Sequence, residues 1–445
     1  MTRRRTAIVA TIAVLALGGG GTAFALGSDD TDRAATSGVS TAAVEVADGT
    51  GVWDSETLHD ISVEVDDAAV AAMIDTYRKT GDKDWIEATV TIDGTTFEQV
   101  GMRLKGNSSL RGVEDGADPT ELPWLLRLDE YVDGQALDGW TDFVVRSNNS
   151  ETALNEAVAL DLLAEAGLAG EHAVATSFSV NGGDAQLRLV VQALDEAWEF
   201  ENFTTDGLLY KSEAGGDWTY RGTDPDSYTD IFDQETGDDD LTPLIDFLDF
   251  LNNSTDAEFE DELASRLDVE AFARYLAFED LVGNTDDIDG PGNNSYLRYD
   301  AETGGFTVVA WDHNLAFGGM GRMGGPGGAG EFGERPEGMP SDMPTDMPTD
   351  FPEGERPDGM PDGMRGGPGG SNVLVERFTE VEAWADLVEQ AKADLTESLY
   401  ASGFADDTID RWAELLTTQA SDLVDADTVA EEADAVRDSI ASLVS

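Results

Sequence analysis

Apolar and polar residues alternate along much of the first half of the chain, and this spacing predicts β-strands. The alternation is clear at residues 61–65 and 88–92, where every second side chain is apolar. After Asp240 the spacing changes to that of helices with one apolar face. The residues that share such faces are Leu244, Phe247, Leu248 and Leu251, and then Phe272, Tyr275, Leu276 and Phe278. The pattern therefore predicts an α+β protein with a strand-rich first part and a mainly helical second part.

The first 25 residues depart from both patterns and predict an export signal. Arg3-Arg4-Arg5 precedes an apolar run from Ala7 to Leu17, and Ala23-Phe24-Ala25 is a small-x-small cleavage motif. The apolar run is too short and too interrupted by glycine for a typical transmembrane helix. We therefore expect a secreted or cell-surface protein that meets the membrane only if an uncleaved signal anchor remains.

Two further stretches lack the periodicity of a folded domain. Residues 26–52 are rich in Ser, Thr, Ala and Asp, and they predict a flexible linker. Residues 318–371 are dominated by Gly, Pro, Met and acidic residues, which bury too little apolar surface to offset the entropy of ordering, so we expect a disordered insert. The expected organisation is a signal peptide at 1–25, a linker at 26–52, a strand-rich region at 53–200, a helical region with the candidate site at 201–317, the insert at 318–371 and C-terminal helices at 372–445.

The charge of the chain restricts its partners. Its 445 residues include 26 Lys and Arg against 92 Asp and Glu, a formal net charge of −66. Such a charge disfavours binding to nucleic acid and to anionic membrane surfaces, so we expect no nucleic-acid partner. Cysteine is absent, and neither disulfides nor thiolate metal sites therefore contribute to stability or function.

A predicted hairpin near residue 300 brings polar residues to one place. Residues 296–299 and 306–311 are rich in aromatic and β-branched side chains, and a turn with glycine separates them. Because antiparallel strands return the chain to its starting edge, Asn294 before the hairpin and Asp312 after it should lie close together. A carboxylate and an amide oxygen at that place suit a hard divalent cation such as Mg²⁺.

Three aspartates, Asp286, Asp287 and Asp289, arrive at the same end of the hairpin from the preceding loop. An Asp beside a metal-bound phosphate can accept a proton from a hydroxyl nucleophile, so this is the layout of a phosphoryl-transfer site. Asp286 is the first candidate for that base, with Asp287 and Asp289 as substitutes. Taken in isolation, the three residues would first be interpreted as a plain acidic turn. An EF-hand loop is excluded, because Thr285 and Tyr296 occupy its first and twelfth positions.

Five short motifs follow one another along the chain. They are Gly101-Met102-Arg103-Leu104-Lys105-Gly106-Asn107-Ser108-Ser109, Trp124-Leu125-Leu126-Arg127-Leu128-Asp129, Leu209-Tyr210-Lys211, Asn284-Thr285-Asp286-Asp287 and Trp311-Asp312. In this order and spacing they resemble the spore-coat protein H (CotH) kinase family, whose members look like secreted atypical protein kinases. The resemblance runs from about Leu58 to Gly318 and resumes near Asn372. It implies an atypical protein kinase-like two-lobed fold, with a strand-rich N-terminal lobe and a mainly helical C-terminal lobe.

The resemblance also implies cofactors and roles for the acidic residues. ATP and Mg²⁺ or Mn²⁺ would be the cofactors, with Asp312 and Asn294 holding the metal ion that bridges the phosphates. Asp286, or Asp287 in its place, would accept the proton of a Ser or Thr hydroxyl on a protein substrate. The expected substrate is a protein at the cell surface or in a coat.

Basic residues are rare enough for those inside the motifs to stand out. Lysine occurs only five times, and Lys105 and Lys211 lie in family motifs, so we expect them to counter phosphate charge together with Arg103 and Arg127. Glu156 lies along the apolar stripe of a predicted helix, where an inward carboxylate needs a partner. Lys105 is the candidate partner, as in the lysine–glutamate pair of kinases. The alternative is that these lysines are solvated surface charges and that Glu156 is hydrated at the rim of the stripe.

Two departures from the family pattern keep a second function open. Relatives usually have lysines where this chain has Glu121-Leu122-Pro123, and an Arg where it has Asn155. If those basic residues neutralise the triphosphate, this chain is a catalytically degenerate protein that uses the same fold for surface binding or adhesion. A third hypothesis, an envelope protein stabilised by Ca²⁺ without nucleotide, predicts stabilisation by Ca²⁺ alone.

Overall fold

The computed structural model describes the chain in six stretches, which are residues 51–106, 108–110, 113–213, 217–290, 294–322 and 372–444. The predicted signal peptide and nearly all of the predicted linker and insert lie outside these residues. The described structure begins with a short 3-10 helix at Gly51–Trp53, whose Val52 is buried although the predicted linker includes it. All described residues belong to one compact unit.

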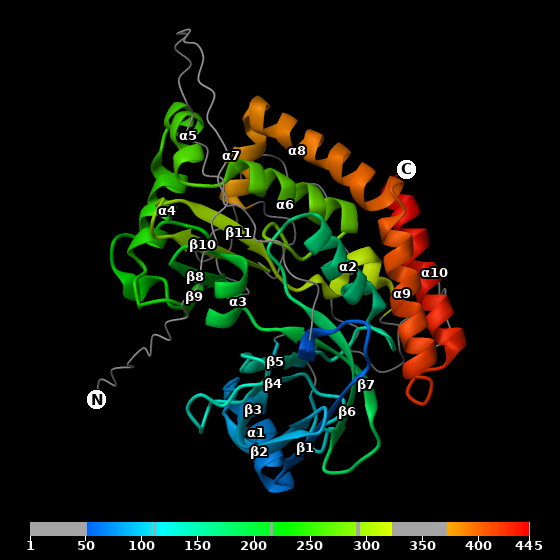
Figure 1. Cartoon of the computed structure of the whole chain (residues 1–445). Helices are drawn as coiled ribbons and strands as arrows, with labels where there is room; N and C mark the ends of the chain where they lie inside the picture. The colour runs from blue at the N-terminus through cyan, green and yellow to red at the C-terminus, as the bar shows by residue number, and fades with distance from the viewer. Residues whose placement is uncertain are drawn as a thin grey trace, which may run out of the picture. The chain divides into compact units, whose positions relative to one another are not determined.

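The first half of the chain forms a closed seven-stranded barrel (Figure 1). Its strands are β1 (His59–Val65), β2 (Ile86–Ile92), β3 (Thr95–Leu104), β4 (Trp124–Arg127), β5 (Asp142–Val145), β6 (Ala173–Val180) and β7 (Gln186–Gln192). Their order around the barrel is β1-β2-β3-β4-β5-β7-β6, and a parallel pairing of β1 with β6 closes it. The other neighbours are antiparallel, so the alternation of apolar residues places every second side chain inside.

The barrel has a hydrophobic core of its own. Ile61 and Val63 of β1 pair with Ile92 and Val90 of β2, and all four are buried. Helix α1 (Asp67–Thr80) follows β1 and packs its apolar side chains into the same core. The α1 helix begins at a side-chain cap from Asp66 and ends at Gly81 in the left-handed conformation.

A second, four-stranded antiparallel sheet follows in the order β11-β10-β8-β9. Its strands are β8 (Gly207–Ser212), β9 (Phe232–Thr236), β10 (Ser295–Asp300) and β11 (Phe306–Ala310). The predicted hairpin is confirmed as β10 and β11, with Ser295 opposite Ala310. Strand β8 lies on the other side of β10, and its Lys211 is paired with Tyr296.

Helices pack around this sheet and beside the barrel. They are α2 (Leu154–Glu165), α3 (Glu196–Asn202), α4 (Thr242–Asn253), α5 (Asp256–Glu262), α6 (Val269–Val282), α7 (Val373–Glu380), α8 (Glu382–Leu395), α9 (Phe404–Gln419) and α10 (Ala426–Leu443). Shorter turns of helix lie at η2 (Ser108–Leu110), η3 (Pro225–Ser227), η4 (Leu263–Ser265), η5 (His313–Arg322) and η6 (Thr396–Ala401). The predicted apolar faces form the buried sides of α4 and α6, which confirms the α+β class. In the described part of the chain no helix is both long and apolar enough to cross a membrane.

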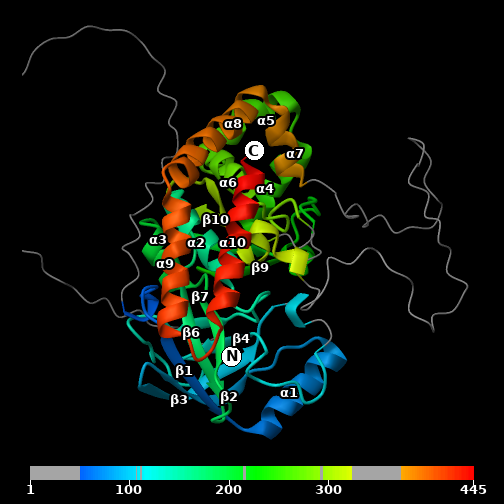
Figure 2. The ribbon, with the colours of Figure 1, turned by 90° about the vertical axis from the view of Figure 1, so that its right-hand side faces the viewer.

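Helix α2 joins the barrel to the C-terminal helices. It packs against α9, α10 and η5, and Figure 2 shows α9 and α10 running side by side next to it. At its N-terminus, the hydroxyls of Ser150 and Thr152 donate hydrogen bonds to the buried carboxylate of Glu432 in α10. The side-chain amide of Asn155 donates to the carbonyl oxygens of Asn314, at 2.8 Å, and Ala316, at 3.2 Å. The α2 helix is therefore fixed to the segment that follows β11.

Candidate functional site

The open end of the β10–β11 hairpin holds both predicted metal ligands. With Ser295 opposite Ala310, Asn294 and Asp312 lie just beyond the paired ends of the two strands. Asp312 has a φ of 66°, a left-handed conformation that is rare for a residue with a side chain and that clusters at functional sites. Its side chain is 22% exposed, so a ligand can reach the carboxylate.

The loop that carries the predicted base is held beside this hairpin. The backbone N–H of Asn294 donates to the carbonyl oxygen of Asp287 at 3.1 Å. Ile288 N–H donates to the Tyr275 hydroxyl at 3.1 Å, which ties the loop to α6. Asp289 N–H donates to the Asp287 carboxylate at 2.9 Å. Burial, and then the nearby carboxylate of Glu279, raise the pKa of Asp287 to about 7.

A buried carboxylate links the loop to the segment after Asp312. Glu279 of α6 is almost fully buried, and it contacts His313 Nε2 at 3.1 Å and the Asn284 side-chain amide at 2.9 Å. The Asp286 N–H donates to Asn284 Oδ1 at 3.4 Å. Burial alone would lower the pKa of His313, but the charge of Glu279 raises it to about 9. The two predicted parts of the site are therefore connected through Glu279.

Basic side chains gather on the barrel side of the site. Lys105 follows β3, and its ammonium group lies 5.7 Å from the ring centre of Trp311, the residue before Asp312. Burial, followed by the positive charges of Lys211, Arg103 and Lys83, lowers the pKa of Lys105 to about 8, although the nearby carboxylate of Glu235 opposes this shift. Three of the five lysines and one arginine therefore share one neighbourhood, in a chain with a net charge of −66. Such a cluster of cations is suited to binding an anion.

The remaining predicted cations differ in their partners. Lys211 is paired with Glu213 at 2.7 Å. Arg103 and Arg127 both lie over the ring of Trp85, at 4.6 and 5.2 Å from its centre. Arg127 also holds the buried carboxylate of Asp142 at 2.6 Å. The structure therefore brings Arg103 together with the lysines, whereas Arg127 is occupied by a structural partner.

The predicted pair of Lys105 with Glu156 is corrected by the structure. Glu156 is buried in α2 as expected, but its partner is Arg146, and the described residues contain no ion pair between Glu156 and Lys105. Arg146 follows β5 and also binds the carboxylate of Asp312. Its guanidinium lies 5.9 Å from the ring centre of Trp311. Because Arg146 directly follows β5, its guanidinium, and not the ammonium group of Lys105, forms the ion pair with Glu156.

Two residues near Asp312, Arg146 and Glu171, were not predicted from the sequence. Arg146 directly follows the apolar run 143–145, the same signal that marked Asp312 after β11. Glu171 is also buried, which raises its pKa to about 7, and one of its carboxylate oxygens has no hydrogen-bond partner. His313 Nδ1 is likewise buried and unpartnered. No feature of the local sequence marks Glu171, because its burial depends on distant elements.

The donor set of this end of the hairpin suits a metal–phosphate complex better than a metal alone. In the part of the chain that the structure describes, no three His, Asp or Glu side chains are grouped so as to hold an ion. Asp312 and Asn294 supply one carboxylate and one amide. Magnesium commonly takes one or two carboxylates and completes its shell with waters and substrate phosphates, whereas Ca²⁺ needs six to eight oxygens. The residues therefore fit Mg²⁺ or Mn²⁺ carried with a nucleotide.

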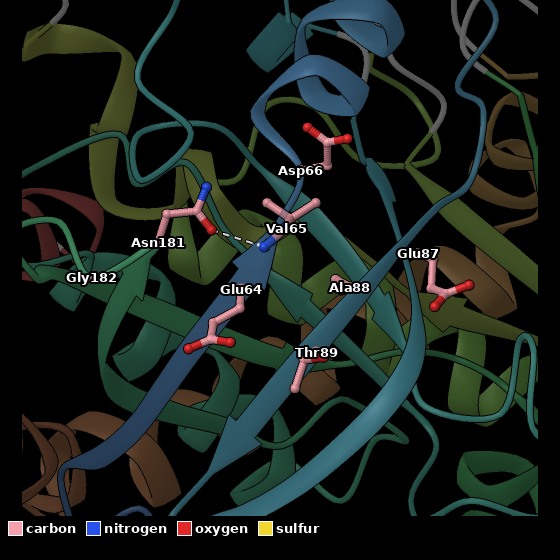
Figure 3. Close-up of a pocket in the computed structure, with 8 residues that line it drawn as sticks. All are labelled: Glu64, Val65, Asp66, Glu87, Ala88, Thr89, Asn181 and Gly182. Carbon is pink, nitrogen blue, oxygen red and sulfur yellow. Dashed lines mark hydrogen bonds between the residues drawn. The ribbon is translucent and has the colours of Figure 1, made fainter.

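A separate pocket of about 590 Å³ lies on the barrel, over β1 and β2 (Figure 3). Its lining includes three carboxylates, Glu64, Asp66 and Glu87, and the side chain of Asn181, which accepts a hydrogen bond from Val65 N–H at 2.8 Å. None of the predicted site residues lines it. Because the described lining offers acidic groups and no cation, this pocket does not suit a phosphate ligand.

The fold and the site together define an α+β protein in which a cation cluster on a barrel faces an aspartate-bearing hairpin. The family model of the CotH kinase protein matches residues 102–443, and the chain therefore belongs to the CotH kinase family, as its motifs predicted. It is similar to the inner spore coat protein H of Bacillus subtilis (strain 168), with 25% identity over 167 residues. That alignment covers 36% of this chain and 45% of the relative, so the chain spans less than half the length of that relative.

Proposed function

We propose that the protein is an exported atypical kinase that transfers the γ-phosphate of ATP to Ser or Thr hydroxyls of a cell-surface or coat protein. The observation that carries the proposal is the meeting of Lys105, Lys211 and Arg103 beside Trp311-Asp312 in a chain that is otherwise strongly acidic. Membership of the CotH kinase family supports the class of reaction. The name of the spore-coat relative supports a location outside the cell or in a coat.

In this proposal Asp312 and Asn294 would hold the divalent cation, which would supply positive charge to the triphosphate during transfer of its γ-phosphoryl group. Lys105, Lys211 and Arg103 bind the phosphate oxygens through charge and hydrogen bonds. The resulting arrangement is kinase-like and two-lobed, with the barrel as one lobe, the second sheet and its helices as the other, and the nucleotide bound where they meet.

Asp287 is the better-supported proton acceptor in this proposal, although Asp286 is the first candidate from the sequence. A general base works best when its pKa lies near the working pH, and burial raises the pKa of Asp287 to about 7. The hydrogen bond from Asn294 N–H to the Asp287 carbonyl fixes that residue beside the predicted metal ligand. Asp287 would therefore take the hydroxyl proton as the oxygen attacks the γ-phosphorus, while the bond from that phosphorus to the β–γ bridging oxygen breaks and ADP leaves.

Two observations favour a second candidate, a catalytically degenerate binding protein. Glu121-Leu122-Pro123 offers no cation before β4, and Asn155 is occupied by the carbonyl oxygens of Asn314 and Ala316. This protein would keep the fold but bind nucleotide weakly or not at all.

A thermal-shift measurement separates these two functions. The purified protein is melted with ATP and Mg²⁺ or Mn²⁺, with each component alone, and as the Asp312→Ala variant. A ligand at about a hundred times its Kd stabilises the native state by roughly 2.7 kcal/mol, which is a readable shift in Tm. We expect a shift that requires both metal and nucleotide and that Asp312→Ala abolishes. A folded protein without that shift would favour the binding function, and a shift with Ca²⁺ alone would favour the envelope protein.

A further inference from the structure

One guanidinium joins two carboxylates at the centre of the candidate site. Arg146 binds Glu156 of α2 and Asp312 after β11, and both ion pairs use the same nitrogen, Nη2. Its side chain is 13% exposed. The guanidinium carbon also lies 5.9 Å from the ring centre of Trp311, a cation–π contact that helps to position the arginine.

The two carboxylates are held differently. Glu156 is the third residue of helix α2, and only 5% of its side chain is exposed. Asp312 lies on a left-handed turn, and its side chain is 22% exposed. Glu156 is therefore a fixed anchor for Arg146, whereas Asp312 is the partner that solvent and ligands can reach.

A divalent cation on Asp312 would compete with Arg146 for the same carboxylate. The guanidinium binds Oδ1 of Asp312, and a metal ion on that oxygen would lie beside a positive charge. Repulsion between the two cations would displace the arginine, which stays tied to Glu156. The planar guanidinium fork then faces a site where phosphate oxygens are expected, and phosphate is a ligand that arginine binds through paired hydrogen bonds.

We propose that Arg146 is a phosphate-binding residue that holds Asp312 until a divalent cation replaces it there. The inference rests on the proposed function, because the phosphates are those of a metal-bound nucleotide. Metal alone binds weakly, since it has to displace an internal cation, and metal with nucleotide binds tightly, since the displaced cation gains a new partner. The two ligands are therefore positively coupled through Arg146.

The test is the affinity for Mn²⁺ measured by electron paramagnetic resonance, with and without a non-hydrolysable ATP analogue. Removing Arg146 leaves two carboxylates that could attract a cation by themselves, so the comparison is made in a Glu156→Gln background. We expect Arg146→Met in that background to bind Mn²⁺ alone about tenfold more tightly and the Mn²⁺–analogue complex about tenfold more weakly. Adding Asp312→Asn should remove the gain in Mn²⁺ affinity.

Two further variants keep the outcome clear. Arg411→Met removes a guanidinium of α9 that is paired with Asp161 of α2, and within the described part of the chain no ion pair joins it to Asp312. This variant should leave Mn²⁺ affinity unchanged. Arg146→Lys keeps the charge but loses the fork, so it should weaken only the binding of the analogue. Unchanged or weaker binding of Mn²⁺ alone in the folded Arg146→Met, Glu156→Gln protein overturns the proposal. If the wild type binds Mn²⁺ but not the analogue, the nucleotide function fails while the gain in Mn²⁺ affinity still tests the displacement of Arg146.

Discussion

Two arginines of this protein, the fully buried Arg298 and the half-buried Arg146, each bridge two carboxylates, and their surroundings differ. Arg298 of β10 is fully buried and binds Glu199 at 3.3 Å and Asp300 at 3.1 Å. The Thr205 hydroxyl accepts a hydrogen bond from Arg298 at 3.1 Å and donates one to Asp300 at 2.6 Å. Glu199 also accepts a hydrogen bond from the hydroxyl of Thr236. Each of these buried charges therefore has several polar partners.

The network around Arg146 is less complete. Asp312 is 22% exposed, and the neighbouring Glu171 and His313 each keep one buried polar atom without a partner. Buried polar groups in native proteins are normally hydrogen-bonded, so unmet ones call for an explanation. A saturated network such as that of Arg298 holds the fold together. We infer that an unsaturated one such as that of Arg146 is available to a ligand.

The largest expected effect contrasts the two arginines directly. Arg298→Met leaves Glu199 and Asp300 as buried charges without their cation, and we expect a loss of about 3–5 kcal/mol in the free energy of unfolding. Arg146→Met should cost less, because it leaves only Glu156 as a buried carboxylate without its cation, whereas water can reach Asp312. Urea denaturation of both variants measures the difference. Equal losses would mean that Arg146 is as structural as Arg298.

The sequence predicted the parts of this picture that depend on local pattern. The hairpin at residues 295–310 and the apolar faces of α4 and α6 are confirmed, as is the inward position of Glu156. Alternation and helical spacing are properties of neighbouring residues, so they can be read from one chain.

Pairings between distant residues could not be read in the same way. The partner of Glu156 depends on where the end of β5 lies relative to α2, and in the folded protein that partner is Arg146, not Lys105. The burial of Glu171 depends on elements that are far apart in the chain. The roles of Asp286, Asp287, Asn294 and Asp312 stay predictions, because placement alone does not measure chemistry.

A second prediction concerns the cost of burying Asp287 beside the site. Its pKa is about 7 in the folded protein, mainly through burial and the charge of Glu279, against about 3.9 in an unfolded chain. The folded state therefore binds the proton more tightly, and stability falls as pH rises from about 4 to about 7.

Asp287→Asn should remove this fall. The amide oxygen can still accept the hydrogen bond from Asp289 N–H, so the variant should be about 2 kcal/mol more stable than the wild type at pH 8 and equal to it near pH 4. Urea denaturation across that pH range measures the effect. Asp268, which caps α6 through Ala271 N–H, is the matched control position, and its Asn variant should show no such gain at pH 8. A difference in stability between the wild type and Asp287→Asn that is constant from pH 4 to pH 8 would contradict the burial cost.

The smallest expected effect is at Lys105, on the other side of the same site. Its pKa is about 8 because of burial and the charges of Lys211, Arg103 and Lys83, against about 10.4 in an unfolded chain. The cost of charging it is fully present below pH 8 and disappears as pH rises toward 10.4. Lys105→Met should therefore stabilise the protein by about 1 kcal/mol at pH 7, with little difference from the wild type near pH 10.

Lys79→Met, at an exposed lysine of α1, should change stability by less than about 0.5 kcal/mol at either pH. Because Lys105→Met removes a cation that the proposed function assigns to the phosphates, it should also weaken the thermal shift with metal and ATP. A Lys105→Met protein that is less stable than the wild type at pH 7 would show that Lys105 supports the fold, as Arg298 does. Lys105 would then belong with the saturated, structural charges and not with the unsaturated network of Arg146.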